Sequence, residues 1–391
     1  MRILLINDYQ SLGGVEVVVD RTASILRGLG HEVEIFAADQ HIKRPSLLGY
    51  ISSRKAKCAL TKVLDRFAPD AIHVHNLYHL CSPAILSVCD ACRTKSGANI
   101  VFSAHDHHLV CPNPGGSVWK HGQRERATMP VDGGLFSLLR NRWDHRSRVH
   151  STMRALQWWW NYSIKRRHLI PDAVVCPSSQ LAELMRERCL PYVHQIPNPL
   201  PELGAYKRHE PGEHLQLVIA GRVEPEKGIA EFIEQWPSEV CATLRIVGEG
   251  SAIERCEQVQ AERAKAHAAG GLTVEFLGRL SHQATLGVIA RSDVLALPSL
   301  VSEAAPLVLD EALAVGTRLL VADQPRLRGL VESTGLGWVY DPLAPGELAQ
   351  VVDQIQSLFE LGGLVITETS DYLKPREPKA FADALIALYT A

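Results

Sequence analysis

Two carboxylates, Glu303 and Glu311, have a spacing that could serve ligand binding. An apolar run over 294–297 leads into a short loop that carries Glu303. Pro306 suits the first position of a helix and Gly316 the position just past its end, so a helix is predicted between them. Glu311 falls in the second turn of this helix. Both carboxylates then lie at the carboxyl end of a strand, where open α/β sheets bind their ligands.

The start of the same helix is suited to an anion. The backbone N–H groups of Ala304 and Ala305 are predicted to lack partners within the helix and to point toward a bound anion. Carboxylates that bind hydroxyls, next to a helix end that binds an anion, indicate a sugar nucleotide as the ligand.

Two glycine-containing loops offer further places for a phosphate. Gly13 and Gly14 follow the first predicted strand, and a glycine turn lets the backbone approach a phosphate closely, although such turns also serve as plain tight connections. After the strand predicted at 215–220, one loop carries Arg222 and Lys227. A guanidinium and an ammonium group together could clamp a diphosphate, and a solvated charged loop is the alternative.

The stretch Val247-Gly248-Glu249-Gly250 is similar to the start of a dinucleotide-binding fingerprint. Ile253 stands where the third glycine is needed, and no acidic residue ends a following strand at the expected distance. We therefore expect no NAD binding.

Strand-like runs alternate with helical patterns along the whole chain. This alternation predicts an α/β protein with parallel sheets covered by helices on both faces. We expect two Rossmann-like, doubly wound domains that face each other across a cleft. The predicted strands are 3–6, 32–37, 71–75, 99–104 and 173–176 in the first domain, and 215–220, 243–247, 273–277, 294–297 and 318–321 in the second.

Three prolines after Ile196, followed by polar residues as far as Glu213, predict the linker between the domains. The expected organisation is a first domain over 1–195, a linker over 196–213, a second domain over 214–376 and a terminal helix within 377–391 that could pack back on the first domain.

The composition is that of a soluble globular protein, with 391 residues, 46% of them hydrophobic and 21% charged. A net charge of −2 gives no general attraction to nucleic acid, so no nucleic-acid partner is expected. The nine cysteines are scattered and odd in number, and no signal peptide or apolar run of about 18 residues is found. We expect a cytoplasmic protein, at most peripheral to the inner face of a membrane.

The segment 140–168 departs from this pattern because it combines basic residues with tryptophans. Eight arginines and lysines stand against one acid, Asp144, and Trp143 and the run 158–160 lie among them. Such a helix suits an anionic membrane surface. The alternative is a helix that covers the sheet, with its tryptophans in the core and its arginines in water.

Taken in order, these motifs resemble the retaining glycosyltransferases of the GT-B fold, specifically glycosyltransferase family 4. The resemblance covers nearly the whole chain. Besides the segments above it rests on His73-Val74-His75-Asn76, Ser103-Ala104-His105-Asp106, Pro197-Asn198, Phe276-Leu277-Gly278-Arg279-Leu280 and Leu297-Pro298-Ser299.

The resemblance implies a role for each group. Glu303 would hold hydroxyls of the donor sugar, Glu311 would bind the nucleotide ribose, and His105 would lie beside the sugar at the reaction centre. Arg222 and Lys227 would neutralise the diphosphate as it leaves. The implied catalytic residues are His105, Arg222, Lys227 and Glu303. The implied donor site comprises Gly13, Gly14, Asn198, Gly221, Arg222, Lys227, Gly248, Arg279, Glu303, Ala304, Ala305, Pro306, Leu307 and Glu311.

The first domain would receive the acceptor, a glycan or a lipid-linked sugar, with His75, Asp106 and His107 on the acceptor side. The histidines also invite a metal interpretation, but no spacing matches a zinc site and no cysteine pair joins them. The family generally works without a metal. We therefore expect no metal and no cofactor, only a nucleoside-diphosphate sugar as substrate.

The predicted activity is a retaining transfer, of hexosyltransferase type, from that donor to a hydroxyl acceptor. The motifs offer no spare carboxylate nucleophile, so attack on the same face with the leaving phosphate as base is the working hypothesis. Two alternatives remain open: a sugar-nucleotide epimerase of the same fold, which needs no acceptor, and a non-catalytic GT-B binding protein.

Overall fold

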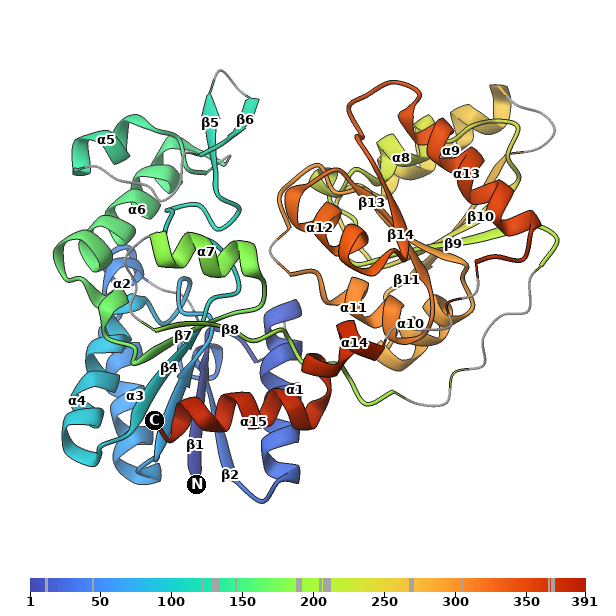
Figure 1. Ribbon diagram of the computed structural model, residues 1–391. Coiled ribbons are helices and arrows are strands. Elements are labelled where there is room, and N and C mark those ends of the chain that lie inside the picture. The colour runs from blue at the N-terminus through green and yellow to red at the C-terminus, as the bar shows by residue number, and fades with distance from the viewer. Residues whose placement is uncertain are drawn as a thin grey trace. The chain divides into compact units, whose positions relative to one another are not determined.

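The computed structural model divides the chain into two compact units (Figure 1). Unit 1 is Met1–Pro199 with Pro375–Ala391, and unit 2 is Leu200–Lys374. The structure describes residues 1–10, 13–43, 46–120, 123–127, 134–144, 146–187, 192–203, 206, 212–266, 271–303, 305–364, 366 and 370–391. Ala304 of the predicted donor site and parts of the predicted linker lie outside these ranges.

Unit 1 is built on a six-stranded parallel sheet with the order β2-β1-β3-β4-β7-β8. Its strands are β1 (Arg2–Asn7), β2 (Glu32–Ala37), β3 (Ala71–Val74), β4 (Asn99–Ser103), β7 (Ala173–Cys176) and β8 (Val193–Gln195). The central strands β1, β3, β4 and β7 are almost wholly buried and are mostly apolar, as inner strands of all-parallel sheets are.

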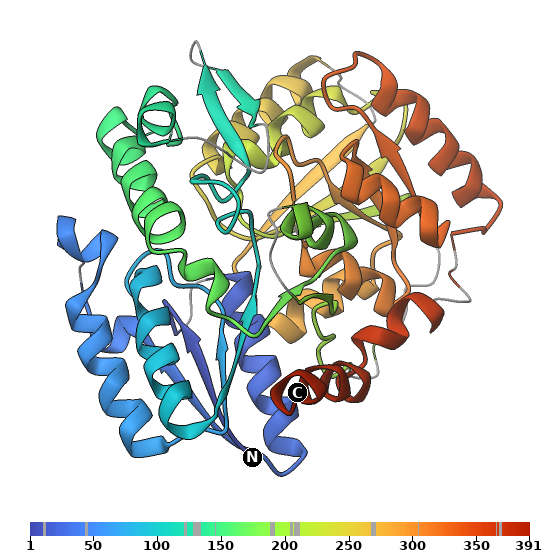
Figure 2. The same cartoon turned by 60° about the vertical axis from the view of Figure 1, so that its left-hand side comes forward.

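Helices cover both faces of this sheet. Successive side chains of β1 point to opposite faces: Ile3 and Leu5 join one core cluster and Leu4 and Ile6 another. The cluster that contains Ile3 and Leu5 is covered by α1 (Gly14–Gly28) and the C-terminal helix α15 (Pro378–Tyr389), which lie side by side in Figures 1 and 2. The second cluster, which contains Leu4 and Ile6, is covered by α3 (Arg54–Phe67), α4 (Leu86–Ser96) and α7 (Ser179–Glu187).

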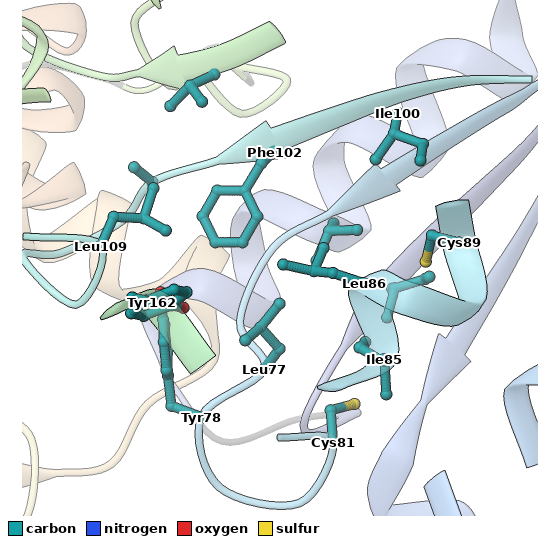
Figure 3. Close-up of a cluster of buried hydrophobic side chains, with 14 of the residues drawn as sticks. Leu77, Tyr78, Cys81, Ile85, Leu86, Cys89, Ile100, Phe102, Leu109 and Tyr162 are labelled. Atoms are coloured by element: carbon teal, nitrogen blue, oxygen red, sulfur yellow. Dashed lines mark hydrogen bonds between the residues drawn. The ribbon is translucent and has the colours of Figure 1, made fainter. Parts of the chain in front are cut away.

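Figure 3 shows the second cluster, where Ile100 and Phe102 of β4 point toward Leu86 and Cys89 of α4. The same cluster reaches a further layer of unit 1 through Tyr162. That layer contains α2 (Leu47–Ile51), α5 (Leu135–Arg140), α6 (Arg148–Trp158), its continuation as a π-helix (Trp159–Ile164), and the antiparallel pair β5 (Ser117–Lys120) and β6 (Gln123–Arg126).

Unit 2 repeats the plan with the strand order β11-β10-β9-β12-β13-β14, again all parallel. The strands are β9 (Leu215–Ala220), β10 (Ala242–Val247), β11 (Leu272–Gly278), β12 (Val294–Leu297), β13 (Arg318–Ala322) and β14 (Gly337–Tyr340). One face is covered by α8 (Ile229–Gln235), α9 (Ile253–Ala266) and α13 (Glu347–Glu360). The other is covered by α10 (His282–Ala290), α11 (Leu307–Ala314) and α12 (Pro325–Thr334).

The prediction of two doubly wound parallel-sheet domains is confirmed. Helix α11, which carries Glu311, begins one residue later than predicted: Pro306 is its N-cap and Leu307 its first residue. In the part of the chain that the structure describes, no helix is long and apolar enough to cross a membrane.

Candidate functional site

In unit 2, the loops after β9 and β10 touch through their glycines. A Cβ atom placed on Gly248 would lie 1.8 Å from the carbonyl oxygen of Gly221, and one on Gly250 would lie 2.1 Å from that of Val223. The Val223 N–H donates to the Glu249 carbonyl at 2.9 Å. The glycines that imitate a dinucleotide fingerprint are therefore required by loop packing, because any side chain would force the two loops apart.

The loop that carries Lys227 is pressed against the loop after β12 in the same way. It forms a short 3₁₀ turn, Pro225–Lys227, that ends at Gly228 with φ of +67°. A Cβ on Gly228 would lie 2.3 Å from the Pro298 carbonyl oxygen, and the Leu300 N–H donates to the Glu226 carbonyl at 2.9 Å. These contacts bring the lysine beside the loop that carries Glu303.

Glu303 is held by two donors. Its Oε1 accepts from Lys227 Nζ at 2.6 Å and from Ser299 Oγ at 2.6 Å. The side chains of Lys227 and Glu303 are only 20% and 13% exposed, so this is a partly buried, charge-assisted contact rather than a surface pair. The sequence analysis assigned Lys227 to the diphosphate and Glu303 to the sugar of one donor, and in the structure the two side chains are in contact.

Gln324, the N-cap residue of α12, fixes the loop from the other side. Its Nε2 donates to the carbonyls of Ser299 and Val301, each at 2.6 Å, and its Oε1 accepts from the Glu303 N–H at 3.0 Å. One amide side chain therefore satisfies three backbone groups of a loop that has no regular hydrogen bonding of its own.

Glu311 lies in the second turn of α11, and its side chain is 7% exposed. Its Oε1 is 2.9 Å from His282 Nε2. Arg222 and Arg279 of the predicted donor site are exposed, and the predicted contacts Ala305, Pro306 and Leu307 are half-buried. The two arginine side chains therefore lie at the surface of unit 2.

In unit 1, the end of β1 organises the neighbouring loops. The buried carboxylate of Asp8 accepts from the N–H groups of His79, Leu80 and Cys81 at 2.7–2.9 Å. Asn7, also fully buried, accepts from the Asn76 N–H at 3.1 Å. The turn after β3 is thus tied to the end of β1.

The predicted Gly13-Gly14 turn lies at the start of α1 and is exposed. Glu16 accepts from the Gly13 N–H at 2.8 Å, which is one half of a capping box at the helix start, and from Asn7 Nδ2 at 3.0 Å. Asn198, the remaining donor-site residue of unit 1, is half-buried.

Three histidines in and after β3 and after β4 form a line: His73 and His75 are buried, and His105 is half-buried. His75 Nδ1 lies 2.9 Å from His105 Nε2, with the two rings stacked, while His73 lies 2.7 Å from the Tyr389 hydroxyl and 2.8 Å from that of Ser103. Burial lowers the pKa of His105 to about 4 and that of His73 to about 3. His105 is therefore a neutral hydrogen-bonding group at neutral pH.

The residues after His105 close a tight turn. Burial opposes the charge on Asp106, but His108, whose Nδ1 lies 2.9 Å from the carboxylate, holds the pKa of Asp106 at about 2. His107 Nδ1 lies 2.9 Å from the Pro114 carbonyl oxygen. His108 stacks on Tyr78 and so belongs to the core.

The basic, tryptophan-rich segment divides into core and surface parts. Trp143 and Trp158 are buried, and each indole N–H donates to a backbone carbonyl. Trp160 is 36% exposed, with Lys165 Nζ lying over its ring. Trp159 is half-buried and packs against the same core cluster, so the core interpretation holds for three of the four tryptophans. No group of three His, Cys, Asp or Glu side chains that could hold a metal ion occurs among the described residues.

Comparisons with known proteins show the family of the chain. The model of Glycosyltransferase Family 4 matches residues 12–201, and that of Glycosyl transferases group 1 matches residues 206–361. The chain belongs to the family 4 glycosyltransferases. A search of curated proteins gives no match.

Several solved structures share the fold of this glycosyltransferase at low identity. Sucrose-phosphate synthase from Thermosynechococcus elongatus is 16% identical with a TM-score of 0.60, over 99% of this chain and 94% of the other. WaaG, a glycosyltransferase involved in lipopolysaccharide biosynthesis, is 16% identical with a TM-score of 0.60 over all of both chains. Anabaena HepE, solved in complex with UDP-glucose, is 16% identical with a TM-score of 0.56, over 100% and 97%.

The sequence reasoning did not single out Gln324, His282 or Asp8 in this family 4 glycosyltransferase. Asp8 follows β1 directly, Gln324 lies two residues after β13, and His282 follows Ser281, the N-cap of α10. What the sequence lacks is the partner of each side chain, because every one of these contacts joins distant parts of the chain.

Proposed function

We propose that the protein is a retaining glycosyltransferase that moves a sugar from a nucleoside-diphosphate donor to a hydroxyl of a glycan or lipid-linked acceptor. The observation that carries the proposal is the contact of Lys227 with Glu303 at 2.6 Å. A cation that can meet a phosphate and a carboxylate that can hold sugar hydroxyls share one place in unit 2, which suits a donor whose sugar is attached to a diphosphate.

Unit 2 binds the donor in this account. Arg222 and Lys227 stabilise the negative charge that develops as the diphosphate leaves, which is the position where preorganised cations lower a barrier most. Glu303 accepts from hydroxyls of the donor sugar, and Glu311 accepts from the ribose. The complex of the structural neighbour HepE with UDP-glucose supports a donor of this class.

Unit 1 contributes the acceptor side and His105. Because His105 is neutral at neutral pH, it acts as a hydrogen-bonding partner of the sugar rather than as a cation. Retention then follows from attack on the face that the diphosphate leaves, with the leaving phosphate taking the acceptor proton. No metal and no cofactor take part in this scheme.

We further propose that unit 1 meets the inner face of a membrane through α5 and α6. Phe136 is 77% exposed and Val149 is 68% exposed, and they stand among exposed Arg140 and Arg148. Apolar and cationic side chains on one surface suit an anionic lipid layer. Sedimentation with vesicles of phosphatidylglycerol at low salt tests this, and a protein that stays in the supernatant favours a soluble acceptor.

The test of the proposed reaction is incubation with a panel of nucleoside-diphosphate sugars and glycan acceptors. We expect transfer that depends on the acceptor, with the anomeric configuration of the donor kept in the product, as read by NMR. Inversion, or a trapped glycosyl-enzyme adduct, would sink the same-face mechanism. An altered nucleotide sugar formed without any acceptor would indicate the epimerase, and failure to bind any sugar nucleotide would indicate the binding protein.

A further inference from the structure

We infer that a pocket in unit 1 binds the anionic group, phosphate or carboxylate, of an acidic acceptor sugar. The inference rests on the proposed sugar transfer and names its acceptor class. The pocket lies between α2, α6 and the loops after β1 and β3. Its volume is ≈ 490 Å³, which is in the range of sites that take a small sugar. Its lining includes Tyr9, Tyr50, His79, Asp144, Arg146 and Arg154.

The charges of this lining do not cancel. Asp144, with its side chain 2% exposed, receives Arg146 in a two-point contact at 3.0 and 2.8 Å and Arg154 Nε at 2.7 Å. Among the lining side chains one carboxylate thus faces two guanidinium groups, while the buried carboxylate of Asp8 lies behind this wall and accepts from the N–H groups of His79 and Leu80. An anion that entered the pocket would find a partly buried cation held in place before it arrives.

One donor of Arg154 has no partner among the residues that the structure describes. Its side chain is 14% exposed, and its Nη1 is buried without a hydrogen-bond partner among the described residues. A buried N–H group of a charged side chain is costly to leave unpaired, so a ligand oxygen at this position would recover that cost. The guanidinium that lines the pocket thus keeps a hydrogen-bonding capacity that Asp144 does not use.

Aromatic rings form the neutral part of the wall. Tyr9 packs against His79 with ring centroids 5.9 Å apart. Tyr50 is held in place because its carbonyl accepts from Gln157 Nε2 at 2.6 Å. Rings of this kind offer an apolar face to the C–H groups of a sugar and a hydroxyl at their rim. The combination of rings and arginines suits a sugar with an acidic group better than a free anion.

The pocket also lies at the end of the sheet where the chemistry is proposed. His79 and Leu80 are anchored by Asp8 at the end of β1, and His105 follows the end of β4 in the same parallel sheet. Carboxyl ends of parallel strands lie along one edge of the sheet, so the pocket and His105 share that edge.

The test is calorimetric titration of the purified full-length protein, without any nucleotide, with glucose 6-phosphate, glucuronate and glucose. We expect one or both acidic sugars to bind at least about tenfold more tightly than glucose, and the better of the two identifies phosphate or carboxylate as the group. Equal binding of all three sugars, or binding of none, would overturn the inference.

Substitution of the pocket arginines gives the second arm. Arg154→Lys keeps a positive charge beside Asp144 but has a shorter side chain that reaches less far toward the ligand. Arg146→Gln changes a side chain that is 53% exposed, so it should disturb folding less. Both variants should bind the acidic sugar about tenfold or more weakly than the parent protein, with the affinity for glucose unchanged. Arg54→Gln, at an exposed arginine of α3 outside the lining, is the matched control and should bind like the parent.

The two proposals fail in different ways. If pocket variants that fold lose no affinity for the acidic sugar, the pocket assignment is wrong whatever the donor. If acidic sugars bind as expected but no nucleotide sugar binds or reacts, the pocket stands and the proposed transfer does not.

Discussion

Lys227 Nζ lies 2.6 Å from Glu303 Oε1, although the two residues follow different strands of unit 2. Two glycine-dependent contacts make this possible, one between the loops after β9 and β10 and one between the lysine loop and the loop after β12. The ion pair holds Glu303 in the position that the proposed donor requires, and it keeps an ammonium group beside that position for the diphosphate.

Lys227→Ala should lower kcat by about two to three orders of magnitude, because loss of one preorganised electrostatic stabiliser typically costs that much. Steady-state transfer with saturating donor measures it. Lys265→Ala, at an exposed lysine of α9, is the control and should leave kcat unchanged. A Lys227→Ala enzyme as fast as the parent would remove this lysine from the reaction.

Gln324→Ala should raise the donor KM about tenfold with a smaller effect on kcat. The change removes three hydrogen bonds that fix the loop of Ser299 and Glu303, each worth about 0.5–1.5 kcal/mol net. Kinetics over a range of donor concentrations separate the two constants. An unchanged KM would show that the loop keeps its shape without Gln324.

Gly248→Ala should destabilise unit 2 by more than about 2 kcal/mol, because the new methyl group meets the Gly221 carbonyl and the backbone has φ of +145°. The melting transition of unit 2 should fall by about 5 °C or more. Gly287→Ala is the control within the same unit: it lies in α10, and its Cβ would have Arg291 Nη1 as nearest neighbour at 3.6 Å. That variant should be neutral or stabilised, and equal melting of both variants would contradict the packing argument.

Much of the fold could be predicted because each strand is a short apolar run and each helix has its own period. The apolar pattern of the sequence did not predict β14 (Gly337–Tyr340), because most of its residues are only half-buried and one of them is a glycine. It also missed the short edge strand β8, which is polar and largely exposed. Edge strands carry a weak apolar signal because one side of them faces water.

The candidate site was predictable as a set of groups but not as a set of contacts. The motif spacing pointed to Glu303, Glu311 and Lys227, yet it could not give the ion pair, the anchoring role of Gln324 or the meeting of Glu311 with His282. These contacts depend on the close approach of loops that are far apart in the sequence. The glycines that permit it looked, in the sequence alone, like part of a nucleotide fingerprint.

The stability of unit 1 should fall as the pH is lowered from about 6.5 toward about 4. His105 has a folded-state pKa of about 4, below the 6.5 of an unfolded histidine, so the unfolded chain binds more protons in this window. Denaturant unfolding at several pH values measures the slope. His105→Gln should reduce the slope without abolishing it, because His73, with a pKa of about 3, contributes in the same window. An unchanged slope would show that His105 titrates normally in the folded protein.

The most direct test of the donor account is thermal unfolding of the protein against a panel of nucleoside-diphosphate sugars, with Lys227→Ala alongside. A ligand present at a hundred times its Kd stabilises the folded state by about 2.7 kcal/mol, which raises the Tm of a domain of this size by several degrees. We predict that at least one donor produces such a shift in the parent and a much smaller one in Lys227→Ala. Absence of a shift with every donor at millimolar concentration, or an equal shift in both proteins, would contradict the assignment of Lys227 and Glu303 to the donor site.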